Sequence, residues 1–61
     1  MPAYLITYSH SHMPPGYVGK AYKHANTPKD AAECIGKYSV KEKVIVDKRR
    51  NVLSNVEITQ L

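Results

Sequence analysis

The chain has few of the residues that stabilise small secreted domains or anchor proteins in membranes. Cys34 is the only cysteine among 61 residues, so no disulfide can form within the chain, and a reducing compartment is expected. No stretch approaches the roughly 20 apolar residues of a membrane span, and the first residues lack the basic and apolar segments of a secretion signal. We therefore expect a cytoplasmic protein that does not bind membranes.

The short length limits what the chain can do. A domain of this size buries only about 60% of the surface that its unfolded chain exposes, so we expect one domain, residues 1–61, with a thin core. The sequence contains no nucleophile elbow, no glycine-rich phosphate loop and no paired carboxylates. These absences predict a binding domain that is not an enzyme and that needs no cofactor.

Positive charge is the most distinctive feature of the composition. Nine Lys and Arg residues stand against five Asp and Glu residues, which gives a formal net charge of +4. Such an excess favours anionic partners. The alternative is that the charge only keeps the protein soluble.

Local patterns predict four strands and one helix. Residues 3–9 and 17–24 are predicted strands, joined by a loop over residues 10–16, and Gly19 is a poor residue for the interior of the second strand unless it marks a bulge. Thr27 and Pro28 predict the start of a helix, and Gly36 its left-handed C-cap, although the helix alternatively continues to Tyr38. Residues 43–47 and 52–59 are predicted strands of a hairpin whose turn is residues 48–51. The expected fold class is α+β, in the order β-β-α-β-β, with a small antiparallel sheet and one short helix packed on one face.

Alternation along the strands divides the predicted sheet into two faces. The residues expected to face the helix are Val44, Val46, Val52, Val56 and Ile58. The open face is expected to carry Lys20, Tyr22, Lys43, Ile45, Leu53, Asn55 and Glu57. An uncovered face with Ile45 and Leu53 beside lysines suggests an interface, either for another protein or for a homodimer.

The predicted contact site is the turn with Lys48, Arg49 and Arg50, whose side chains can extend to acidic groups or phosphates. Further contacts are expected from Lys20, Tyr22, Lys23 and Lys43. The alternative is a turn that is merely solvated. A second hypothesis is nucleic-acid binding, in which Tyr22 stacks on a base between lysines that contact phosphates.

Histidine and cysteine residues raise the question of a metal site. Imidazole and thiolate groups are preferred zinc ligands, and the chain contains His10, His12, His24 and Cys34. Their spacing lacks the close pairs of a structural zinc site, and the second half of the chain adds no further His or Cys. We therefore predict polar loop histidines and no metal site.

The architecture resembles that of small proteins encoded by bacteriophages and mobile elements, including anti-CRISPR inhibitors of surveillance complexes. The resemblance is carried by the strand at residues 3–8, the helix entry at residues 25–32 and the hairpin that contains residues 44–46 and 51–53. It implies a viral inhibitor or regulator that binds a host protein or ribonucleoprotein in the host cytoplasm. The positive charge of this chain implies contact with acidic protein surfaces or with nucleic acid, and not mimicry of DNA.

Overall fold

The computed structural model describes residues 1–10, 13–14 and 16–61, and these form a five-stranded sheet with one helix. The elements are β1 (Ala3–His10), β2 (Gly19–His24), α1 (Pro28–Glu33), β3 (Gly36–Ser39), β4 (Val44–Asp47) and β5 (Val52–Gln60). The prediction of a small α+β domain with an antiparallel sheet and one short helix is confirmed. The predicted order of elements lacked one strand, because β3 follows the helix directly. Within the described residues, no helix has the length and apolar character needed to cross a lipid bilayer.

The helix begins where the sequence predicts and ends earlier. Thr27 is the N-cap, and its hydroxyl oxygen accepts a hydrogen bond of 3.1 Å from the backbone amide of Asp30. Gly36 is not the C-cap, since it is the first residue of β3. A Cβ atom at this position would overlap the backbone of Val46 in β4, so glycine permits the close pairing of these two strands. The alternative helix end at Tyr38 is also wrong, because Tyr38 lies in β3.

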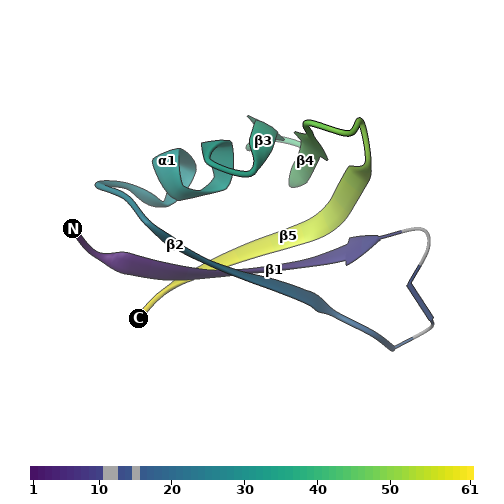
Figure 1. Cartoon of the computed structure of the whole chain (residues 1–61), viewed down its shortest axis with the longest axis horizontal. Coiled ribbons are helices and arrows are strands. Elements are labelled where there is room, and N and C mark those ends of the chain that lie inside the picture. Colours follow the sequence, from purple (N-terminus) through teal and green to yellow (C-terminus); the bar gives the residue numbers. More distant parts are fainter. Residues whose placement is uncertain (11–12, 15) are drawn as a thin grey trace.

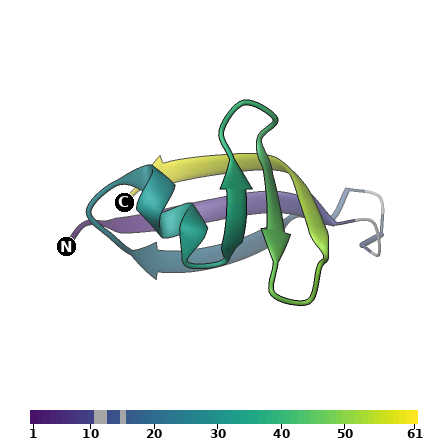
Figure 2. The same ribbon diagram turned by 90° about the horizontal axis from the view of Figure 1, so that it is seen from above.

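The strands follow the order β2-β1-β5-β4-β3, and every neighbouring pair is antiparallel. Figures 1 and 2 show that α1 and the β3–β4 hairpin lie across one face of β1, β2 and β5. The hydrophobic core fills the space between these two layers. It consists of Tyr4, Ile6, Ala25, Ala31, Ala32, Ile45, Leu53 and Val56.

Strand β5 pairs with β1 in one layer and with β4 in the other, and it contains a β-bulge. Thr7 pairs with Glu57, but two residues later Ser9 pairs with Ser54, so β5 has one extra residue at this point. Asn55 adopts a left-handed conformation there, with φ of 51°. Bulges of this kind bend a strand and increase its twist, and Figure 1 shows β5 curving upward toward β4.

The bulge explains why the predicted faces were wrong in part. Val56 and Ile58 do lie in or against the core, as predicted. Strict alternation places Leu53 and Val56 on opposite faces, whereas the extra residue turns both toward the core, where they are 4% and 3% exposed. Ile45, which pairs with Leu53, is 0% exposed. Ile45 and Leu53 are therefore core residues and not part of an open interface. Val46 and Val52, which were predicted to face the helix, are paired on the exposed side.

An uncovered sheet face does exist, but it belongs to β1, β2 and β5. The outward side chains of β2 are Lys20, Tyr22 and His24, all exposed, and Tyr22 is 66% exposed. Gly19 does not mark a bulge, because the register from Ala3–His24 to Tyr8–Gly19 is continuous. Of the predicted loop, Ser11, His12 and Pro15 lie outside the described residues, and His10 is the last residue of β1.

Candidate functional site

The turn between β4 and β5 is organised by the carboxylate of Asp47. Its Oδ1 atom accepts hydrogen bonds from the backbone amides of Arg49 at 2.8 Å and Asn51 at 2.9 Å. Its Oδ2 atom accepts a hydrogen bond of 3.2 Å from the Asn51 side chain. Arg50 takes up the left-handed conformation, with φ of 64°, and its amide donates a hydrogen bond of 3.0 Å to the Asp47 carbonyl. The turn therefore holds the backbone beneath Lys48 and Arg49 in one arrangement.

The same hydrogen bonds keep Asp47 ionised. The backbone amide of Asn51 has the largest effect in lowering the pKa of Asp47 below its ordinary value of 3.8, against a smaller opposing effect of desolvation. The Asn51 side chain, the Arg49 amide and the charge of His10 lower this pKa further. The ionised carboxylate offsets one unit of the positive charge that Lys48, Arg49 and Arg50 bring to the turn.

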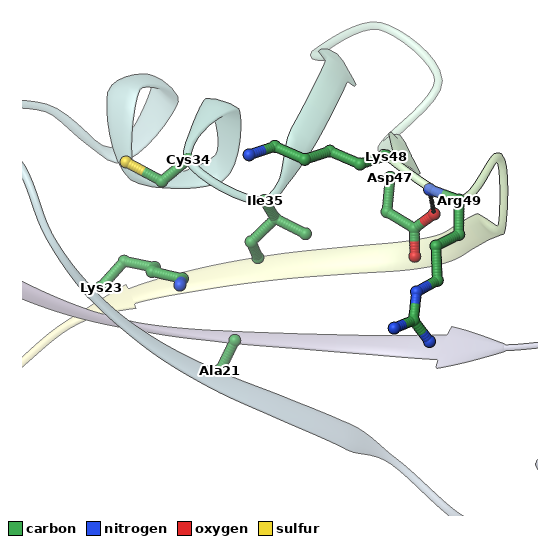
Figure 3. A pocket seen from close by; sticks show the side chains of 7 residues that line it. All are labelled: Ala21, Lys23, Cys34, Ile35, Asp47, Lys48 and Arg49. Carbon is green, nitrogen blue, oxygen red and sulfur yellow. Dashed lines mark hydrogen bonds between the residues drawn. The ribbon is translucent and has the colours of Figure 1, made fainter.

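The turn forms one wall of an open groove of about 360 Å³. Ala21, Ile35 and Cys34 form its less polar surface, and Cys34 is an exposed free thiol. Lys23, Lys48 and Arg49 place three cationic side chains around it, and Asp47 is the one carboxylate among the described lining residues. Figure 3 shows the ammonium group of Lys23 extending toward Ile35 from the β2 side, while Lys48 and Arg49 extend from the hairpin.

The fold brings together some predicted contact residues and separates others. Lys23 is far in sequence from Lys48 and Arg49, and the three now share one groove. Lys20 and Tyr22 lie on the opposite face of β2, because successive side chains of a strand alternate. Arg50 and Lys43 are exposed but do not line the groove. Lys43 has φ of 56° at the end of the β3–β4 loop, where its carbonyl accepts a hydrogen bond from the Val56 amide.

Sequence reasoning missed four residues of the groove. Ala21, Cys34 and Ile35 carry no pattern that distinguishes a groove surface from an ordinary core. Asp47 did carry a signal, because an Asp directly before a polar turn commonly accepts hydrogen bonds from the backbone of that turn. Alternation on β2 also separates Lys23 from Lys20 and Tyr22 on sequence grounds alone.

A second open hollow of about 510 Å³ is lined by Gly16, Tyr17, Val18 and Lys20. It is larger than the groove, but among the described residues its lining has a single charged side chain, Lys20, and comes from one short segment. The groove is therefore the better candidate for a binding site, because more charged side chains line it.

Metal ligands do not gather in the part of the chain that the structure describes. No group of three or more His, Cys, Asp or Glu residues there could hold a metal ion. His12, one of the four candidates, lies outside that part.

The comparisons with protein families, characterised proteins and solved structures give no match for this chain.

Proposed function

We propose that this protein is a non-enzymatic binding module that holds an acidic protein surface in the groove between β2 and the β4–β5 turn. The observation that carries the proposal is that Lys23, Lys48 and Arg49 line one depression, although Lys23 is distant in sequence from the other two. Two of these cations stand on a turn whose backbone is fixed by Asp47. A turn whose backbone is already ordered loses less conformational freedom on binding than a mobile one.

The lining of the groove favours protein over nucleic acid. Single-stranded nucleic acids are usually held by aromatic side chains that stack on bases, and no tyrosine lines the groove in the described part of the chain. Tyr22, the residue predicted to stack, lies on the other face of β2. Ala21 and Ile35 instead offer a small apolar surface, which suits the aliphatic parts of protein side chains.

A regulatory or inhibitory role belongs to the same proposal. A module that covers an acidic surface blocks whatever else binds there, which is the mode of action implied by the resemblance to phage-encoded inhibitors. In that setting the partner is a host protein, or the protein component of a host ribonucleoprotein.

A charge reversal inside the groove, matched by one outside it, tests the proposal. Lys23→Glu and Lys20→Glu change the net charge equally and lie on the same strand, but only Lys23 lines the groove. We expect poly-glutamate to bind the unmodified protein at low salt, and Lys23→Glu to weaken this binding at least about tenfold more than Lys20→Glu. Arg49→Glu and Arg50→Glu form a second matched pair on the turn.

Two results would contradict the proposal. Equal losses within each pair would mean that only the net charge of the protein matters. Tighter binding of an oligothymidylate than of poly-glutamate, with the same dependence on Lys23, would assign the groove to nucleic acid.

A further inference from the structure

The outer edge of β2 borders the groove and is not paired with another strand in the described part of the chain. In an antiparallel pair, residues that exchange hydrogen bonds alternate with residues whose amide and carbonyl groups point away from the partner. The Ala25 amide donates to the Pro2 carbonyl at 3.1 Å, which places the hydrogen-bonded positions of β2 at residues 19, 21 and 23. The backbone groups of Lys20, Tyr22 and His24 therefore point outward.

A second hydrogen bond supports this assignment of the hydrogen-bonded positions in β2. If the Tyr4–Lys23 pair exchanges hydrogen bonds, the backbone groups of Ala3 must point from β1 toward β5. The carbonyl of Ala3 does accept a hydrogen bond of 2.9 Å from the amide of Leu61, just beyond β5. The free edge of β2 thus offers three residues with outward donors and acceptors, spaced as a pairing strand requires.

We infer that the partner supplies an extended acidic segment that adds to the edge of β2 as a sixth strand, an inference that rests on the proposed function. Main-chain hydrogen bonds to an exposed sheet edge are a recurrent mode of peptide recognition, in which side-chain pockets give specificity. The side chains of Ala21 and Lys23 face the groove, so the segment residues opposite them face it too. Acidic residues at these alternate positions come within reach of Lys23, Lys48 and Arg49.

A second copy of the chain fits this edge less well. Pairing of β2 with β2 from another molecule adds a strand with one lysine on each face, Lys20 and Lys23, to an edge that already carries the same two charges, and like charges on adjacent strands are destabilising. The cationic groove beside the edge adds to this repulsion. An acidic strand is attracted by the same lysines, so charge complementarity favours it over self-association.

The test uses the intact protein and a capped peptide of alternating Val and Glu, long enough to span β2. We expect amide exchange at Lys20, Tyr22 and His24 to slow at least tenfold on binding, measured by nuclear magnetic resonance. The control peptide has the same sequence with N-methyl groups on the amides that face β2, which keeps the charge and prevents pairing. We expect it to bind at least tenfold more weakly.

The outcomes separate this inference from the proposed function. If both peptides bind equally, with contacts at Lys23 and Arg49 but no protection at Tyr22, strand addition is wrong while the groove still binds acidic protein. If neither peptide nor poly-glutamate binds at low salt, the proposed function itself fails. If size-exclusion chromatography with light scattering shows a dimer whose β2 amides are protected without peptide, the edge belongs to a second copy.

Discussion

Tyr8 packs against Gly19 across the β1–β2 pair, where an added Cβ atom would meet the tyrosine ring. Glycine is a poor strand residue in isolation, but here it makes room for an aromatic side chain that packs against the core. We expect Gly19→Ala to lower the free energy of unfolding by about 1–3 kcal/mol, the usual effect of overpacking. Urea denaturation measures this change.

A double-mutant cycle provides the control for Gly19. In a Tyr8→Val background the ring is gone, so Gly19→Ala should cost much less free energy than in the unmodified protein. An equal cost in both backgrounds would show that the tyrosine ring is not the cause.

Asp47 should make the stability of the β4–β5 turn depend on pH. Its pKa is lower in the folded protein than the ordinary 3.8, mainly because the Asn51 amide donates a hydrogen bond to the carboxylate. The unfolded chain therefore binds more protons between these two pKa values, and stability rises with pH across that range. The contribution of Asp47 is present above pH 3.8 and is lost as pH falls through the lower, folded-state value.

The change that isolates this effect is Asp47→Asn, which keeps a side-chain acceptor but does not titrate as a carboxyl. We expect the stability difference between the unmodified and variant proteins to shrink as pH falls below 3.8, measured by denaturant unfolding at each pH. A carboxyl resonance of Asp47 that titrates at or above 3.8 would contradict the assignment.

At the scale of elements, the bulge at Asn55 decides which side chains of β5 form the core. The left-handed conformation there is readily adopted by Asn and Gly but is costly for a β-branched residue. We expect Asn55→Val to lower the free energy of unfolding by about 1–2 kcal/mol, and Asn55→Gly to leave it within about 0.5 kcal/mol.

The matched control for the bulge is Thr59→Val, on an exposed position in the regular part of β5. Valine is favoured in strands, so this variant should be as stable as the unmodified protein. Equal losses for the two valine variants in thermal unfolding would show that the conformation of Asn55 is unimportant.

The elements that could be predicted are those with local signals. Thr27 and Pro28 mark the helix start through hydrogen-bonding and backbone preferences that act within one turn. The bulge at Asn55 has no such signal, because it is a register shift between β5 and β1. β3 was missed for a related reason, since the four residues Gly36–Ser39 form a strand through pairing with β4.

The site was predicted in part for the same physical reason. A cluster of like charges such as Lys48 and Arg49 is visible in sequence, and so is a hairpin turn. The approach of Lys23 to that turn joins segments that are distant in sequence, and no local pattern announces it. The bulge in β5, which bends the strand that leads away from the turn, is equally hidden from the alternation of side chains.

At the scale of the whole molecule, the net charge of +4 and the groove should act on different steps of binding. Long-range attraction raises the rate of encounter with an acidic partner, and salt screens it as the Debye length falls from about 10 Å at 0.1 M to about 3 Å at 1 M. Contacts inside the groove set how long the complex lasts. We expect added salt to lower the association rate of the Val–Glu peptide at least about tenfold and to change its dissociation rate less.

The pair Lys20→Glu and Lys23→Glu separates the two effects in stopped-flow measurements. Both variants lose the same charge from the whole molecule, so both should slow association to a similar degree. Only Lys23→Glu removes a cation that lines the groove, so only this variant should speed dissociation, by at least about tenfold. If Lys20→Glu speeds dissociation as much, the peptide contacts the outer face of β2 and not the groove.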